Sequence, residues 1–263
     1  MKLKFQLLFI LLIEFVIHSN GQNKYVKQIT GARKHALLSI VEFPADSTYY
    51  SVGNSLNSLN VEKPVLIKSD KFGNILWTKI YDFSVPHHHD QRFLKIIYSS
   101  SSKNFFVTGI FANDTSAFND EFYSFVCIID TAGNVILNKK YKPLSDILIC
   151  DLVTTSDSGC VAIGMYNFLS PALGTDTISA FLIKFDKNLN QQWANFYSNS
   201  FSLKGISLTQ LPDSGFFFSG AIKTDSSLAS HLAAVRTDKN GIIIWSKSTN
   251  LVNENVTCYI KFK

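Results

Sequence analysis

Residues 65–81 read VLIKSDKFGNILWTKIY, and three later stretches align with them: FVCIIDTAGNVILNKKY at 125–141, FLIKFDKNLNQQWANFY at 181–197 and AAVRTDKNGIIIWSKST at 233–249. Each stretch carries an aspartate, and these anchors (Asp70, Asp130, Asp186 and Asp238) lie 60, 56 and 52 residues apart. Apolar residues alternate before each aspartate, which is the period of a half-buried strand. The aspartate and the Gly-Asn that follows it in two of the copies are typical of tight turns. Each stretch therefore predicts a hairpin.

A second hairpin precedes each of these, as in LLSIVEFPADSTYYSVG at 37–53. These hairpins end at Gly53, Gly109, Gly164 and Gly220, which are 56, 55 and 56 residues apart. Two hairpins give four strands per repeat, named A to D in chain order. Such a repeat without helical periodicity predicts an all-β fold, a β-propeller of four-stranded antiparallel blades with about four full blades plus partial terminal strands. A stack of β-sandwich modules is the alternative, but it needs longer linkers than the short D-to-A connections.

The first residues predict a signal peptide at 1–21, because two lysines precede an apolar run that ends in small and polar residues. The run is shorter than the ~20 residues that cross a bilayer, and no later stretch reaches that length. We therefore expect an exported protein without a membrane span, in the extracellular space, at the cell surface or in the periplasm. The mature domain is then 22–263.

The expected repeats are 33–85, 90–142, 145–198 and 203–250, with a partial repeat at 254–263. The last stretch aligns with an opening strand, with Cys258 near the slot of Cys150, and Tyr25 and Lys27 fit the Trp and Lys slots of an outer strand. The ring is then either a tight four-bladed one with frayed ends or an incomplete one. An incomplete ring would expose blade edges and favour self-association.

These segments, with their Asp-Lys-x-Gly-Asn-x-x-x-Trp-x-Lys-x-Tyr pattern, resemble the repeats of secreted Bacteroidetes-type β-propeller proteins. They are more distantly similar to quinoprotein dehydrogenase-like propeller repeats. The resemblance covers nearly all of the mature chain and implies a fold rather than an activity. Quinoprotein enzymes of that fold are expected to carry a vicinal cysteine pair, whereas the four cysteines here are separated. The resemblance therefore implies no catalysis and no cofactor.

The recurring residues are expected to build the blades. The tryptophans should pack between neighbouring blades, and each aspartate should close its own turn rather than bind calcium, since no further carboxylates stand at calcium-loop spacing. The structural repeat residues are Asp70, Asp130, Asp186, Asp238, Trp77, Trp193, Trp245, Gly53, Gly109, Gly164 and Gly220. Cys127, Cys150 and Cys258 lie in apolar strand-like runs and are expected to be buried free thiols, and Cys150 with Cys160 is the one pair to test for a disulfide.

The B-to-C loops vary most in length and are rich in Asn, Ser, Thr and Asp. In an up-and-down blade the B-to-C and D-to-A loops leave the same face, so that face is the expected binding surface for a protein or a glycan. A D-to-A loop there contains His87, His89 and Asp90, which form a candidate metal site for zinc or copper. The formal charge of +5 is too small and too scattered to indicate nucleic acid.

No motif of a catalytic Ser elbow, zinc protease, P-loop or dinucleotide site is present. The sequence therefore favours a non-enzymatic binding or scaffold module that presents its variable loops, and not an enzyme. The alternative is a polysaccharide-acting hydrolase or lyase, which needs paired carboxylates on the loop face. Its candidates are Asp114, Asp120, Glu121 and Asp176.

Overall fold

The computed structural model describes residues 35–59, 61–83, 89–113, 122–141, 147–170, 175–197, 202–223 and 231–249. All of them belong to one compact unit, Arg33–Lys263. The expected signal peptide at 1–21, the outer strand with Tyr25 and Lys27, and the partial repeat at 254–263 lie outside the described residues.

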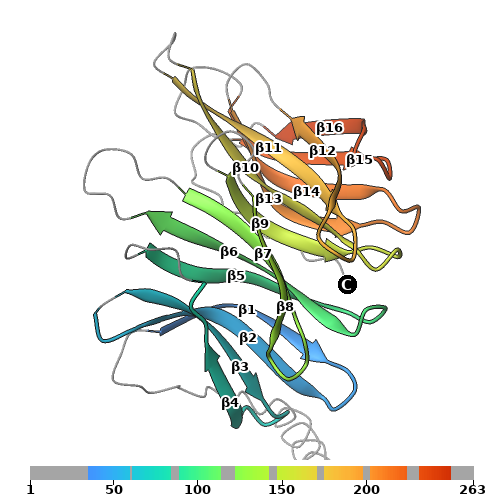
Figure 1. The fold of residues 1–263 in the computed structure, drawn as a ribbon. Helices are drawn as coiled ribbons and strands as arrows, with labels where there is room; N and C mark the ends of the chain where they lie inside the picture. Colours follow the sequence, from blue (N-terminus) through green and yellow to red (C-terminus); the bar gives the residue numbers. More distant parts are fainter. Residues whose placement is uncertain are drawn as a thin grey trace, which may run out of the picture. The chain divides into compact units, whose positions relative to one another are not determined.

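Sixteen strands make up the described chain and form four sheets of four (Figure 1). Sheet 1 contains β1 (His35–Phe43), β2 (Thr48–Leu56), β3 (Glu62–Ser69) and β4 (Ile75–Ile80). Sheet 2 contains β5 (His89–Ser99), β6 (Asn104–Asn113), β7 (Phe122–Ile129) and β8 (Val135–Tyr141). Sheet 3 contains β9 (Ile147–Thr154), β10 (Cys160–Ser170), β11 (Thr175–Phe185) and β12 (Gln191–Tyr197). Sheet 4 contains β13 (Ser202–Gln210), β14 (Phe216–Lys223), β15 (His231–Thr237) and β16 (Ile243–Thr249).

Every sheet is antiparallel, with its strands in chain order, and every first strand has an irregularity at the same place. In sheet 1 the register shifts between Leu37 and Ser39, opposite Gly53. A Cβ on Gly53 would lie 1.8 Å from the carbonyl oxygen of Ala36, so only glycine fits there. The recurring glycine therefore marks a bulge that bends the first strand of each sheet.

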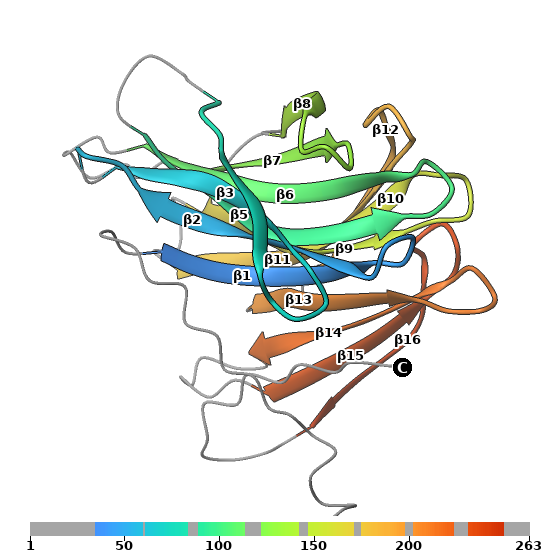
Figure 2. The same ribbon diagram turned by 90° about the horizontal axis from the view of Figure 1, so that it is seen from below.

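The first strand of each later sheet packs against the sheet before it. Strand β5 contacts β1, β2 and β3, β9 contacts β5, β6 and β7, and β13 contacts β9, β10 and β11. The first strands β1, β5, β9 and β13 consequently lie side by side, as Figure 2 shows, and they are called the inner strands below. This is the arrangement of propeller blades, and it confirms the predicted all-β fold of about four blades.

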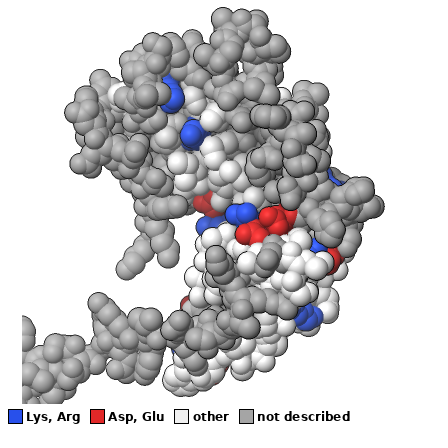
Figure 3. All heavy atoms as spheres, turned by 90° about the vertical axis from the view of Figure 1, so that its left-hand side faces the viewer, with Lys and Arg blue, Asp and Glu red and all other residues white. Residues whose placement is uncertain are grey.

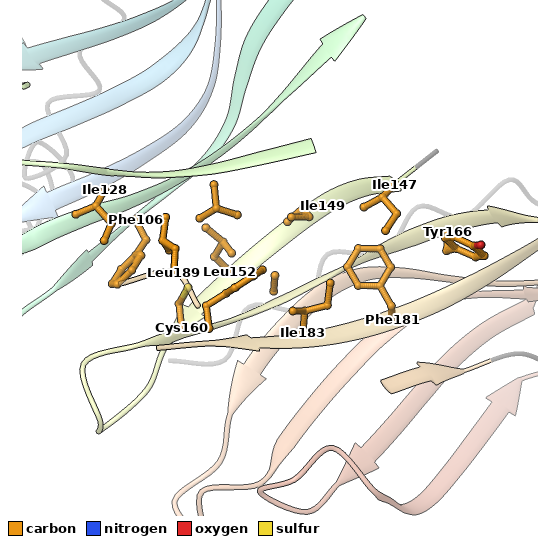
Figure 4. Packing of buried hydrophobic residues seen from close by; sticks show 13 residues of the cluster. Phe106, Ile128, Ile147, Ile149, Leu152, Cys160, Tyr166, Phe181, Ile183 and Leu189 are labelled. Atoms are coloured by element: carbon orange, nitrogen blue, oxygen red, sulfur yellow. The ribbon is translucent and has the colours of Figure 1, made fainter. Parts of the chain in front are cut away.

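Three apolar clusters fill the spaces between consecutive sheets. Figure 4 shows the middle one, where Phe106 and Ile128 of sheet 2 face Ile149 and Leu152 of sheet 3. Sheets 1 and 2 share a second cluster, and sheets 3 and 4 share a third. The hydrophobic core is therefore divided among the interfaces between neighbouring blades. Among the described strands, no comparable contact joins sheet 4 back to sheet 1.

The repeat aspartates lie in the turns between the third and fourth strands. Asp70 Oδ1 accepts hydrogen bonds from the backbone N–H groups of Phe72 and Asn74 at 2.9 and 2.8 Å. The other three aspartates accept equivalent bonds from the backbone N–H four residues later. In the turns held by Asp70, Asp130 and Asp238, the fourth residue is a glycine at positive φ.

The tryptophans lie on the outer strands at the side of the following sheet. Trp77 reaches the turn of sheet 2, where a Cβ on Gly133 would be 2.9 Å from its ring. Trp193 stands in the same relation to Gly241 of sheet 4, at 3.0 Å. Trp245, on the last described strand, packs edge-on against Phe217 and is 37% exposed.

Candidate active site at the loop end of the sheets

The ends of the strands place several charged residues at one edge of sheets 1 and 2. Glu62 begins β3 directly after the B-to-C loop, and Asp90 is the second residue of β5, directly after the D-to-A loop. Both loops leave their sheets at the same end because the strands alternate in direction. Residues 28 apart in the sequence therefore meet where the variable loops emerge.

Glu62 and Asp90 are joined directly across the two sheets. The backbone N–H of Glu62 donates to Asp90 Oδ1 at 2.8 Å. Arg92 Nη2 lies 2.8 Å from Glu62 Oε2, with about a third of the arginine side chain and a fifth of the glutamate side chain exposed. This ion pair lacks hydrogen-bond alignment, since Glu62 Oε2 is buried without a hydrogen-bond partner. The glutamate is therefore held in place by its charge interaction with Arg92.

A second ion pair flanks this pair of carboxylates. Lys63 Nζ lies 3.0 Å from Asp82 Oδ1, with half of the aspartate side chain exposed. Figure 3 looks onto the loop end of the sheets and shows basic and acidic atoms side by side at the middle of that face. Acidic and basic side chains of the described residues thus gather here in near balance.

The inner strands carry a second polar group, one residue past each bulge. The four residues are 56 apart: Ser39, Lys95, Asp151 and Ser207. Ser39 Oγ accepts from the N–H of Ile96 in the next sheet at 3.3 Å. Lys95 Nζ lies 2.9 Å from Asp151 Oδ1. These residues link each inner strand to the next.

Asp151 is at the centre of that layer, and both of its carboxylate oxygens are fully engaged by partners. Oδ1 accepts from its neighbour Leu152 N–H at 2.9 Å and pairs with Lys95. Oδ2 accepts from Leu208 N–H at 3.0 Å and from the Ser207 hydroxyl at 3.2 Å. A carboxylate with four such partners has no lone pair left for a substrate, so this layer is structural.

The expected metal site is only partly within the described residues. His87 and the His89 side chain lie outside them, and Asp90 is bound to the backbone of Glu62. No group of three or more His, Cys, Asp or Glu residues that could hold an ion occurs in the described part of the chain. The metal site at His87, His89 and Asp90 stays a prediction.

The carboxylates proposed for the enzyme alternative cannot be placed. Asp114, Asp120 and Glu121 fall in the 114–121 loop outside the described residues, and of Asp176 only the backbone is described, in β11 opposite Leu169. The B-to-C end of the sheets, where they belong by sequence, is the end that carries Glu62 and Asp90.

Three of the four cysteines are described, and all three are free thiols. Burial raises the pKa of Cys150, with a smaller contribution from Asp151, and raises that of Cys160 as well, each to about 12. Burial also raises the pKa of Cys127. Cys150 and Cys160 form no disulfide, and their thiols are protonated and unreactive at neutral pH.

The sequence reasoning missed Glu62, Arg92 and the inner-strand layer. The layer residues are spaced by 56, the period that the glycines already suggested. They differ in residue type, however, so no sequence pattern identifies them: Ser39, Lys95, Asp151 and Ser207. Glu62 and Asp90 are in no motif, and only the stacking of two sheets brings them together.

Comparison with known proteins finds likeness in structure alone. No family model matches the sequence, and no curated protein matches it. The structure is similar to an endo-arabinase from Bacteroides thetaiotaomicron, with a TM-score of 0.50, 12% identity, and coverage of 88% of this chain and 85% of that one. Two family GH43 β-1,3-galactosidases have TM-scores of 0.46 and 0.48 at 14% and 10% identity. This chain covers 50% and 74% of their lengths, and they cover 84% and 80% of it.

This comparison overturns the function that the sequence favoured. A non-enzymatic binding or scaffold module was expected, but the solved structure that shares the fold at a TM-score of 0.50 is an enzyme, an endo-arabinase. The same likeness contradicts the expectation that the chain is not an enzyme, because this fold occurs in an enzyme. At 12% identity the likeness itself establishes the β-propeller fold. The described residues include no helix long and apolar enough to cross a membrane.

Proposed function

We propose that this protein is an exported glycoside hydrolase that acts on a polysaccharide, with Glu62 and Asp90 as its pair of carboxyl groups. One observation carries the proposal, namely the 2.8 Å hydrogen bond from the backbone N–H of Glu62 to Asp90 Oδ1, which brings the two acidic residues together across sheets 1 and 2 at the loop end. The likeness of the fold to an endo-arabinase supports a carbohydrate substrate. The predicted signal peptide supports export, since polymers of this kind lie outside the cell.

Hydrolysis of a glycosidic bond uses two carboxyl groups on either side of the bond. One donates a proton to the departing oxygen, and the other activates water or attacks the sugar carbon. Asp90 presents its carboxylate with Oδ1 held by the Glu62 N–H, so its orientation is fixed. Glu62 is held by its ion pair with Arg92, whose Nη2 lies 2.8 Å from Glu62 Oε2.

Arg92 positions Glu62 rather than taking part in proton transfer. A guanidinium keeps its charge in proteins and cannot act as acid or base. Its Nη2 lies 2.8 Å from Glu62 Oε2, and its side chain is about one-third exposed. An exposed cation at this position can also hold a sugar hydroxyl by a charge-assisted hydrogen bond.

The test is the release of new reducing ends from a panel of polysaccharides that includes arabinan and β-1,3-galactan. We expect turnover by the wild type and a loss of about 100-fold or more in Glu62→Gln and Asp90→Asn, the size typical of a lost general acid or base. Asp82→Asn is the matched control because it removes a carboxylate from the same end, and it should keep wild-type turnover.

Two substrates separate the roles of the pair. A variant lacking the proton donor should keep activity on an aryl glycoside, whose leaving group needs little protonation, and a variant lacking the base or nucleophile should regain turnover with azide. If Glu62→Gln and Asp90→Asn both keep wild-type turnover while Asp120→Asn or Glu121→Gln abolishes it, the assignment to Glu62 and Asp90 is wrong.

A further inference from the structure

The loop-end half of sheet 4 differs in charge from the same part of sheets 1 and 2. In sheets 1 and 2 the cations lie beside carboxylates, as in the ion pairs Lys63–Asp82 and Arg92–Glu62. The described loop-end residues of sheet 4 contain no aspartate or glutamate, but they include three lysines: Lys204, Lys223 and Lys247. Figure 3 likewise shows, in the upper part of the loop end, basic atoms with no acidic atoms of the described residues beside them.

Two of these lysines are neighbours on one face of the sheet. Cross-strand partners point to the same side of a sheet, and so do residues two apart on one strand. Lys204 of β13 is paired with Ala221 of β14, and Lys223 lies two residues after Ala221. Diagonal neighbours of this kind lie about 7–8 Å apart. Both ammonium groups can therefore reach the same anionic group.

The third lysine joins this face from the outer strand. Ala221 is paired with Leu232 of β15, and Ala234, two residues later, is paired with Lys247 of β16. Lys247 Nζ lies 5.7 Å from the centre of the Trp245 ring, which is 37% exposed. Lysines from three strands thus surround small apolar side chains beside an exposed aromatic ring, and these residues are called the lysine face below.

The lysine face points away from sheet 3. Leu203 and Ala233 belong to the apolar cluster between sheets 3 and 4, and they are the sequence neighbours of Lys204 and Ala234. Because consecutive side chains of a strand point to opposite sides, the lysines lie on the other side of sheet 4. In the described part of the chain, no carboxylate pairs with Lys204 or Lys247.

Lys204 lies at the level of the candidate active site. A Cβ on Gly220 would lie 1.7 Å from the carbonyl oxygen of Lys204, and one on Gly109 would lie 2.4 Å from that of Arg92. Lys204 therefore has the place in β13 that Arg92 has in β5. Strand β9 lies between these two strands and contacts both, so they are separated by two sheet spacings, or no more than about 20 Å. A polymer bound beside Arg92 can extend over that distance.

We propose that the lysine face binds the acidic groups of an anionic polysaccharide, so that the substrate of the proposed hydrolase carries carboxylate or sulfate groups. A lysine ammonium donates charge-assisted hydrogen bonds to either group. The apolar side chains and the Trp245 ring supply the apolar part of a ligand site, which few but well-placed polar groups make specific. The inference rests on the proposed function for the kind of polymer, but binding is measured without turnover.

Affinity electrophoresis of the full chain measures this binding. We expect polygalacturonate to retard the wild type, and its uncharged, carboxyl-reduced form to leave migration unchanged. Dextran sulfate compared with dextran forms the sulfate arm of the test and shows which acidic group is bound. Salt at about 0.5 M should remove the retardation, because it screens exposed charges. Retardation by neither acidic polymer, or equal retardation by charged and uncharged polymers, would overturn the proposal.

Variants of single lysines locate the binding surface. Lys204→Gln and Lys223→Gln should each raise the dissociation constant about 5-fold, as expected for the loss of one exposed charge pair, whereas Lys204→Arg should stay close to the wild type. Lys239→Gln is the matched control, because it removes an exposed lysine from the turn at the other end of sheet 4. If Lys239→Gln weakens binding as much as Lys204→Gln does, net charge alone attracts the polymer and the lysine face is not the site.

Turnover separates this inference from the proposed function. A wild-type protein that binds an acidic polymer at these lysines but hydrolyses no polymer of the panel would refute the hydrolase and leave the lysine face in place. A protein that hydrolyses a neutral polymer but binds acidic polymers no better than uncharged ones would refute the lysine face and leave the hydrolase in place.

Discussion

Replacement of Asp151 by alanine tests the claim that the inner strands are held together by a polar layer. The change leaves the backbone N–H groups of Leu152 and Leu208 without their acceptor, and both residues are almost completely buried. Each unsatisfied buried donor costs about 1–3 kcal/mol. Lys95 also loses its partner, but its side chain is about one-third exposed, so solvent limits that contribution to about 0–1 kcal/mol.

We therefore expect Asp151→Ala to lower the free energy of unfolding by about 4 kcal/mol, mainly from the two buried donors. The assay is urea unfolding followed by tryptophan fluorescence. Asp151→Asn keeps an acceptor oxygen for only one of the donors and should cost about 2 kcal/mol. Asp82→Ala removes a half-exposed carboxylate that pairs with Lys63 and should cost less than about 1 kcal/mol. An Asp151→Ala protein within about 0.5 kcal/mol of the wild type would refute this account of the layer, because such a change is typical of an ordinary surface site.

Three further predictions concern the turns and the thiols. Leu189 has a φ of 57° yet is buried in the core between sheets 2 and 3. Leu189→Gly should relieve about 1 kcal/mol of backbone strain but lose about 2–3 kcal/mol of stabilisation from side-chain burial. The variant should therefore be less stable than the wild type in urea unfolding. The backbone N–H of Asn190 holds the pKa of Asp186 below 3.8, so its stabilising effect is present above that pH and is lost as the pH falls through the lowered pKa. Unfolding measured from pH 5 to pH 2 should therefore show a smaller loss of stability in Asp186→Asn than in the wild type, and an equal loss would count against the turn. Cys150 and Cys160 have pKa values of about 12, so they should react with iodoacetamide at pH 8 only after urea unfolds the protein. Fast labelling of the folded chain, measured by mass spectrometry, would contradict the burial of these two thiols.

The blade pattern could be predicted because it is carried by local chemistry. Asp70 is followed by a glycine three residues later at a φ of 79°, and both are requirements of the turn itself. Leu189 departs from that pattern because its burial against sheet 2 compensates for the unfavourable φ. That compensation depends on the packing of two sheets and is invisible in a single turn.

The candidate site could not be predicted in the same way. Glu62 follows a loop in sheet 1 and Asp90 follows a loop in sheet 2, so neither is near the other in sequence. Their contact arises because β5 packs on β3, which fixes a distance that no motif encodes. The loop end was expected to be the binding face, but the carboxylates chosen for it came from the loops rather than from the strand ends.

The function inferred from the sequence went wrong for a related reason. The repeat residues that give the resemblance, such as Asp70 and Trp77, build the blade and carry no information about chemistry. The absence of known catalytic motifs was then read as the absence of an enzyme. A carboxylate pair needs only two acidic residues in the right place, so motif searches do not find it.

The most direct test of the central claim is the reducing-end assay on the full-length wild-type protein with the polysaccharide panel. We predict the release of new reducing ends from at least one polymer, lost in both Glu62→Gln and Asp90→Asn and retained in Asp82→Asn. No release from any polymer by a folded wild-type protein, or release that both variants retain, would contradict the claim that this loop end is the active site of a glycoside hydrolase.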